Sequence, residues 1–103
     1  MRRVRILDES ANEATEAAAW YESQRAGLGA DFARAIDAAL DLLEEEIVPL
    51  TVIPGRHGNR VKRLMLKRFP YDVVVTESRD EIVVVAFAHQ SRRPGYWKAR
   101  LRA

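Results

Sequence analysis

Seven consecutive apolar residues, Ile82 to Ala88, constrain the fold of this chain more than any other feature of its sequence. Valine, isoleucine and phenylalanine favour strands, and a strand that is apolar at successive positions must have both of its faces covered. We therefore predict a central strand at Glu81–Gln90, packed on both sides.

Two further strands are predicted immediately before this run. Arg60–Phe69 ends at Pro70, and Tyr71–Glu77 ends at a polar turn of residues 78–80. Short polar interruptions between β-prone segments are typical of antiparallel hairpins. Residues 60–90 thus predict a three-stranded antiparallel meander. We expect the preceding residues to cover one face of it and the following residues to lie at its end.

The N-terminal residues predict a strand and a helix. Arg2–Leu7 alternates between apolar and polar side chains, as a half-buried strand does. Ser10 and Glu13 have the spacing of a capping box, which predicts a helix from there to about Arg25. The inward stripe of this helix is predicted to consist of small side chains and aromatic rings: Ala14, Ala17, Ala18 and Tyr21, broadened by Trp20.

A second helix is predicted from about Ala30 to Glu46. Gly27 and Gly29 precede it, at the place where the end of a helix favours a positive φ. Its apolar residues recur at helical spacing and should dominate the core; they are Phe32, Ile36, Leu40, Leu43 and Ile47.

These elements predict an α+β fold in one domain, residues 1–103, with an antiparallel sheet on a helical hairpin. Prolines 49 and 54 and a polar loop of residues 56–59 separate the helices from the meander. A short helix is expected within Pro94–Leu101. The chain has no cysteine and no apolar stretch of membrane-spanning length. We expect a cytoplasmic protein with no disulfide, no metal site and no cofactor.

Charge divides the chain into two halves. Residues 1–55 contain five arginines and eleven acids, a net charge of −6, whereas residues 56–103 have a net charge of +8. Such an asymmetry indicates an anionic partner for the sheet half, either nucleic acid or an acidic polypeptide. The alternative is a sheet edge whose charge protects it against aggregation.

Three stretches resemble one known family. They are residues 17–29 (AAAWYESQRAGLG), residues 68–71 (RFPY) and residues 88–97 (AHQSRRPGYW). Together they resemble the helix junction, second hairpin and C-terminal signature of the RelE/ParE superfamily. The resemblance implies a β-α-α-β-β-β fold. It also implies the toxin half of a bacterial type II toxin–antitoxin pair, neutralised by a cognate antitoxin.

Within that superfamily, RelE-like members are metal-independent ribonucleases that cut mRNA on the ribosome, and ParE-like members are inhibitors of DNA gyrase. The helix-junction and C-terminal stretches resemble the ParE side. RelE-like nucleases have a catalytic arginine after the tyrosine that matches Tyr71, where this chain has Asp72. The C-terminal tyrosine that those nucleases use corresponds to a position near Trp97 in this chain, and Tyr96 is adjacent to it. The resemblance favours a ParE-like binding toxin and leaves a RelE-like endoribonuclease, or a member without toxicity, as alternatives.

An endoribonuclease would need an acid–base group and cations for the phosphate. His89 is the best candidate for the former, at the end of the third strand and on the same side as Val85 and Phe87 by alternation. Its alternative role is a capping histidine whose ring bonds a backbone carbonyl. Arg68 and Arg92 could contact the phosphate.

Further residues are candidates for binding nucleic acid or a protein partner. The basic ones are Arg60, Lys62, Arg63, Lys67 and Arg93. Tyr96 and Trp97 could stack on a base or pin the C-terminal segment to the body of the protein. An acidic antitoxin segment, disordered when free, would suit the basic half.

Overall fold

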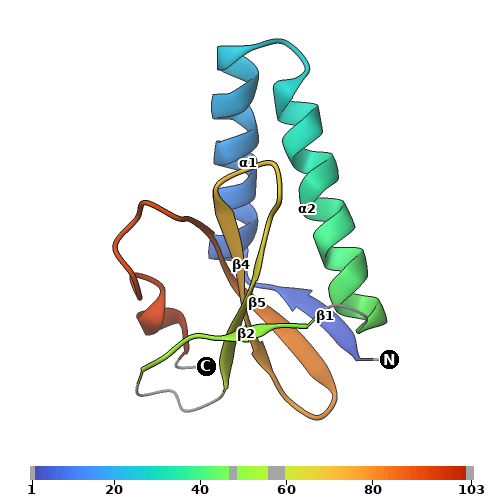
Figure 1. Ribbon diagram of the computed structural model, residues 1–103, viewed down its shortest axis with the longest axis vertical. Coiled ribbons are helices and arrows are strands. Elements are labelled where there is room, and N and C mark those ends of the chain that lie inside the picture. Colours follow the sequence, from blue (N-terminus) through green and yellow to red (C-terminus); the bar gives the residue numbers. More distant parts are fainter. Residues whose placement is uncertain (1, 47–48, 56–59, 102–103) are drawn as a thin grey trace.

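Two helices and a five-stranded sheet form the computed structural model, which describes residues 2–46, 49–55 and 60–101 (Figure 1). Residues 56–59, with His57, and Ile47 of the predicted stripe lie outside the described residues. The sheet order is β1-β5-β4-β3-β2. The elements are β1 (Arg3–Ile6), α1 (Asp8–Gln24), α2 (Leu28–Glu45), β2 (Thr51–Val52), β3 (Val61–Met65), β4 (Tyr71–Glu77), β5 (Glu81–His89) and a 3-10 helix, η1 (Lys98–Leu101).

The α+β class and the antiparallel meander β3-β4-β5 are confirmed, and β5 is an interior strand between β1 and β4. The sheet as a whole is mixed, because β1 pairs with β5 in parallel. The first meander strand is shorter than predicted, since the Leu66 amide donates to the Tyr71 carbonyl (2.9 Å) and the chain bends at residues 67–70. β2 was not predicted, because a two-residue strand carries no readable alternation.

The predicted capping box is wrong. Helix α1 begins at Asp8, and no side chain caps its first turn at Leu7. Ser10 lies inside the helix, where its buried hydroxyl donates to the Val84 carbonyl (3.0 Å). Glu13 likewise reaches β5 and accepts from the Phe87 amide (3.1 Å). Contacts with the sheet have replaced the local hydrogen bonds that the spacing suggested.

Helix α2 begins two residues earlier than predicted, at Leu28. Gly27 has the expected positive φ of 90°, whereas Gly29 is buried within the helix. A Cβ at Gly29 would lie 2.6 Å from the Ala18 carbonyl oxygen, so this glycine permits close approach of the two helices. The Glu22 carboxylate accepts from the amides of both glycines and so caps the start of α2.

The first core lies between the helices and the sheet. Phe32, Ile36 and Leu43 of the predicted stripe are buried there, and Leu40 packs against them. The Phe32 ring is surrounded by other rings at centroid distances of 5.0–5.2 Å, from Tyr21, Phe69 and Tyr71. Trp20 does not broaden the stripe of α1 as predicted: it is 59% exposed.

A second core lies on the opposite face of the sheet. Trp97 is buried there against residues of the meander, namely Val61, Val74, Val85, Ala86 and Ala88. The residues after β5 therefore cover the second face of the sheet and do not merely lie at its end, as we had expected. Both faces of β5 are covered, as its apolar run predicts. Within the predicted 94–101 helix, only η1 is helical.

A β-bulge in β5 changes which side chains share a face. Val75 pairs with Val84 and Val74 with Ala86, so Val85 has no partner in β4. Val85 and Ala86 both belong to the second core, and Phe87 returns to the first. The prediction that His89 shares a side with both Val85 and Phe87 is therefore wrong, because one extra residue reverses the alternation.

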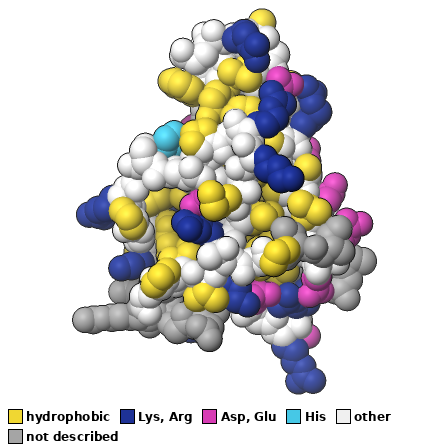
Figure 2. Space-filling model, viewed as in Figure 1, with side chains coloured by type: hydrophobic (Ala, Val, Ile, Leu, Met, Phe, Trp, Pro, Cys, Tyr) yellow, Lys and Arg dark blue, Asp and Glu magenta, His cyan; other side chains and the backbone are white. Residues whose placement is uncertain are grey.

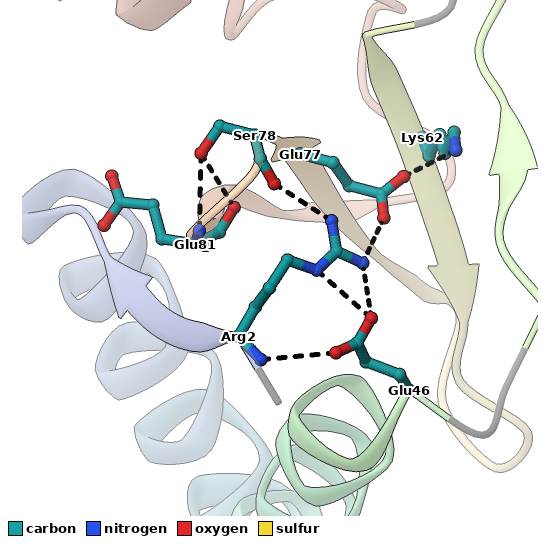
Figure 3. A network of polar contacts seen from close by, with 6 residues as sticks. All are labelled: Arg2, Glu46, Lys62, Glu77, Ser78 and Glu81. Carbon is teal, nitrogen blue, oxygen red and sulfur yellow. Dashed lines mark hydrogen bonds and ion pairs between the residues drawn. The ribbon is translucent and has the colours of Figure 1, made fainter.

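Arg2 joins the ends of several elements (Figure 3). Its side chain donates to Glu46 after α2 (2.9 Å), to Glu77 at the end of β4 (2.7 Å) and to the Ser78 carbonyl (3.1 Å). Lys62 of β3 also pairs with Glu77 (2.5 Å). The hydrogen bond from Lys62, followed by that from Arg2, holds the pKa of Glu77 below its usual value.

Phe32→Ala should destabilise the protein more than any substitution of a surface acid. Removal of the ring leaves a cavity in the aromatic cluster, for which we expect a loss of about 3–5 kcal/mol in the free energy of unfolding. The exposed change Asp41→Ala on the same helix should stay within about 0.5 kcal/mol. Chemical denaturation of both variants checks the ranking, and equal losses would contradict this placement of the core.

The Glu77 pairs should make stability sensitive to acid. Because the folded-state pKa of Glu77 is below the ordinary value of 4.5, its contribution is complete above pH 4.5 and is lost as the pH falls through the folded-state pKa. The stability difference between the wild type and Glu77→Gln should therefore shrink as the solution is acidified. Denaturation across that range measures it. Glu44→Gln, an exposed control, should show no such trend, and a constant difference for Glu77→Gln would refute the ion pairs.

Candidate functional site

Two hollows meet at a ridge formed by His89 and Arg92. The first, here called the Trp20 hollow, lies between α1 and the end of β5. The second opens on the sheet face that carries the second core, and Arg63, Asp72, Gln90 and Trp97 are among its lining residues. His89 and Arg92 line both hollows. The remaining residues of the Trp20 hollow are Glu13, Glu16, Ala17, Trp20, Tyr71 and Phe87.

Glu13 of α1 is the centre of the polar contacts beneath this ridge. Its Oε1 accepts from the Phe87 amide (3.1 Å) and from Arg100 (3.0 Å), and its Oε2 accepts from the Tyr96 hydroxyl (2.6 Å) and from Arg100 (3.2 Å). Arg100 also donates to the carbonyl of the bulged residue Val85 (3.0 Å). One carboxylate thus joins α1, β5 and the C-terminal segment.

The tyrosine in this cluster is held in its neutral form. Burial, and then the neighbouring Glu13 carboxylate, raise the pKa of Tyr96 well above its usual value. The Arg92 guanidinium lies over the Tyr96 ring at 3.7 Å from its centroid, and its contact with Glu13 Oε2 is 3.8 Å. Arg92 is 55% exposed. The ridge therefore presents a cation whose position is set by Tyr96 and Glu13.

His89 is fixed by its neighbours in one orientation. Its Nδ1 accepts from the Ser91 amide (3.0 Å) and lies 2.8 Å from the Ser91 hydroxyl, and its ring meets Tyr71 edge to face. Because a backbone amide can only donate, Nδ1 carries no proton, and the neutral ring has its N–H at Nε2. The ring thus bonds an amide and not the backbone carbonyl that the capping alternative expected.

The structure brings together only two of the three predicted catalytic residues. His89 and Arg92 share the ridge. Arg68 precedes β4, where it pairs with Asp31 of α2 (3.6 Å) and lies over the Phe69 ring, and it lines neither hollow.

The predicted basic residues lie on different faces. Lys62 is bound to Glu77 on the side of α2, whereas Arg63 points to the opposite face and pairs with Asp72 (3.4 Å). Gln90 also donates to Asp72 (3.1 Å), whose carboxylate is buried. Arg60 lines a separate hollow beside β1 and β4, and Lys67 and Arg93 are exposed. These cations form no single continuous strip.

Tyr96 and Trp97 serve the second of their two predicted roles in this structure. Trp97 is only 4% exposed and belongs to the second core, so its ring faces are not available for stacking on a base. Tyr96 is bonded to Glu13. Both residues pin the C-terminal segment to the sheet.

Sequence reasoning missed Glu13 and Trp20 as site residues. Glu13 precedes the small-residue stripe of α1 and was assigned to a helix cap, because its local spacing does not distinguish it from a capping residue. Trp20 was assigned to the core. Among the described residues, no group of three acidic, histidine or cysteine side chains could hold a metal ion, and no helix is long and apolar enough to cross a membrane.

Comparison with known proteins identifies the fold. No family model matches the sequence, and no curated protein matches it. A chain of a solved structure, described as "Chromosomal ParDE TA system from P. aeruginosa", superposes with a TM-score of 0.72 and 14% sequence identity. The match covers 86% of this chain and 96% of that one. The chain has the RelE/ParE fold. This confirms the fold that the sequence resemblance implied.

Glu13→Gln should loosen the C-terminal segment. The amide leaves the partly buried Arg100 without its counter-charge, for which we expect a loss of about 2–3 kcal/mol in the free energy of unfolding. The exposed Glu16→Gln, one turn away, should stay within about 0.5 kcal/mol. Chemical denaturation measures the free energy of unfolding of both variants. Hydrogen exchange of the Trp97 indole should become faster in Glu13→Gln and stay unchanged in Glu16→Gln. Equal stabilities would contradict the role of Glu13.

Proposed function

We propose that this chain is the toxin of a bacterial type II toxin–antitoxin pair of the ParE type. It would act in the cytoplasm by binding DNA gyrase, without chemistry of its own, and a cognate antitoxin would neutralise it. The observation that carries the proposal is the fold shared with a chain of the ParDE system from P. aeruginosa. The ParE-like helix junction and C-terminal stretch support the same assignment.

The ridge supports binding better than RNA cleavage. Metal-free cleavage needs a base, an acid and cations that converge on one phosphate. Here the buried carboxylate of Asp72 occupies the place of the nuclease arginine and takes Arg63 as its partner. Arg68 is bound to Asp31 away from the ridge, and the lone pair of His89 is already used by Ser91.

Two exposed features support a protein partner. A shallow, mostly apolar groove runs between α1 and α2, lined by Ala14, Ala18, Phe32, Ala33 and Ile36 with Thr15 and Asp37. The edge strands β1 and β2 each have one unpaired side within the described sheet. Apolar grooves and free strand edges are the surfaces on which partner helices and strands dock, and an antitoxin segment that folds on binding could use either.

The alternative is a RelE-like mRNA endoribonuclease that acts on the ribosome. One observation favours it: His89 and Arg92 share an exposed ridge, and the ring of His89 presents an N–H at Nε2. In that case the Nε2–H of His89 and the Arg92 guanidinium would both donate to the phosphate.

Inhibition of purified DNA gyrase tests the favoured function. Supercoiling of a relaxed plasmid should stop when the protein is added in micromolar excess, and the product of a neighbouring antitoxin gene should restore it. The same protein denatured by heat serves as the negative control. Undiminished supercoiling at that excess would contradict gyrase as the target.

Substitution of His89 distinguishes the two functions. If the protein is a binding toxin, His89→Ala should still arrest growth when expressed without antitoxin, because the imidazole does no chemistry. If it is a nuclease, the same change should abolish both growth arrest and mRNA cleavage. Circular dichroism of the purified variant confirms that it remains folded.

A further inference from the structure

We propose that the groove between α1 and α2 binds a basic amphipathic helix of a partner polypeptide. Apolar side chains of that helix would fill the groove, and its lysines or arginines would pair with acids on the α2 side. This chemistry is opposite to that of the acidic segment expected for the basic half of the chain. The inference concerns the helical layer and does not depend on the target of the protein.

The groove has an apolar floor and walls of small side chains. Phe32 and Ile36 are buried members of the first core that reach its floor. Ala14 and Ala18 line it on the α1 side, and Ala33 lines it on the α2 side. Alanine side chains let a third helix approach closely, because the ridges of one helix pack into the grooves of another.

The size and the walls of the groove suit a helix. Its volume of about 310 Å³ is roughly twice that of a cavity of about 150 Å³ that admits benzene, so about two large apolar side chains would fill it. The Thr15 hydroxyl in its wall already donates to the Ala11 carbonyl (3.1 Å). Both walls are helices, whose backbone groups bond within each helix, so an extended strand would find no backbone partners here.

The charge of the two helices determines the sign of the occupant. Helices α1 and α2 together contain ten acids and one arginine, a net charge of −9. That arginine, Arg34, is already paired with Asp31. In Figure 2, acidic side chains project along the edge where Figure 1 places α2. A positively charged partner is therefore attracted to this layer of the molecule.

Three of these acids form a stripe beside the groove. Asp37 lines it, and Asp41 and Glu44 follow at spacings of four and three residues, which places them on the same side of α2. All three are exposed, and none belongs to an ion pair among the described residues. Lysines or arginines that flank an apolar seam would pair with this stripe. Nucleic acid, an acidic segment and the same hairpin of a second copy would be repelled.

Binding of a synthetic helix tests the charge of the site. A blocked, labelled peptide of leucine, alanine and lysine, with its leucines at helical spacing, should bind the full chain saturably in fluorescence anisotropy at physiological salt. Asp37→Lys should weaken binding about tenfold, because it reverses a charge in the wall of the groove. The matched control Glu16→Lys makes the same change at an exposed acid of α1 outside the groove. It should alter the affinity by less than about twofold.

A second pair of variants tests the shape of the site. Ala33→Gln places a longer uncharged side chain in the groove and should weaken binding about tenfold. Ala38→Gln, at an exposed alanine of α2 outside the groove, should change the affinity by less than about twofold. Circular dichroism confirms that the variants are folded. If Ala33→Gln does not fold, Thr15→Gln on the opposite wall replaces it, with the same expected loss.

Several outcomes would overturn the proposal. They are the absence of saturable binding, equal losses in Asp37→Lys and Glu16→Lys, an unaltered affinity when the groove is filled, or equal binding of a peptide in which glutamate replaces lysine. None of these outcomes bears on the inhibition of gyrase, which is measured separately.

Discussion

The carboxylate of Glu13 is the contact on which the arrangement of this molecule depends. Strand β1 pairs with β5 only as far as Val84, so the edge of β5 beyond that point lacks a strand partner on this side. Side chains of helix α1 bond backbone groups of β5 in this region: Ser10 donates to the Val84 carbonyl, and Glu13 accepts from the Phe87 amide. Between them, the bulged Val85 offers its carbonyl to Arg100, which Glu13 also holds. The Phe87 amide and the Val85 carbonyl, which a ladder would otherwise satisfy, are thus satisfied by side chains, and Ser10 adds a second donor to the Val84 carbonyl, which also accepts from the Leu7 amide.

The same contact determines what the molecule shows to a partner. Because Glu13 holds Tyr96 and Arg100, the C-terminal segment lies across the second face of the sheet and buries Trp97. The Arg92 guanidinium in turn lies over the Tyr96 ring, and Arg92 lines the same two hollows as His89. A ridge with a positioned cation and an aromatic neighbour, on which the described residues form no converging catalytic set, is suited to recognition. That character agrees with the function we propose for a chain of the RelE/ParE fold.

The sequence predicted the parts of the fold that repeat along the chain. The helical spacing of apolar residues in α2 and the consecutive apolar residues in β5 correctly predicted which side chains are buried, because many residues in each element repeat the same pattern. Features that depend on single residues were not predictable in this way. One extra residue at Val85 reversed the faces of β5 beyond it, and a two-residue β2 had no pattern to read.

The candidate site was harder to predict, since its members meet only through tertiary contacts. His89 and Arg92 were recognised from their chemistry and proved to be neighbours, while Arg68 and Lys62 are held elsewhere by Asp31 and Glu77. Local spacing assigned Glu13 to a cap, because no sequence rule indicates that an acid one turn into a helix will pair with an arginine 87 positions later. The contacts of Glu13 with Tyr96 and Arg100 also place Trp97 in the second core, and these contacts could not be read from the sequence.

A double-mutant cycle between Glu13 and Arg100 tests this account most directly. The free energy of unfolding would be measured for the wild type, Glu13→Gln, Arg100→Gln and the double variant. If the carboxylate and the guanidinium hold the C-terminal segment together, the two losses will fail to add, with a coupling energy of about 1–3 kcal/mol. Losses that add to within about 0.5 kcal/mol would show that the two residues act independently and would contradict the account.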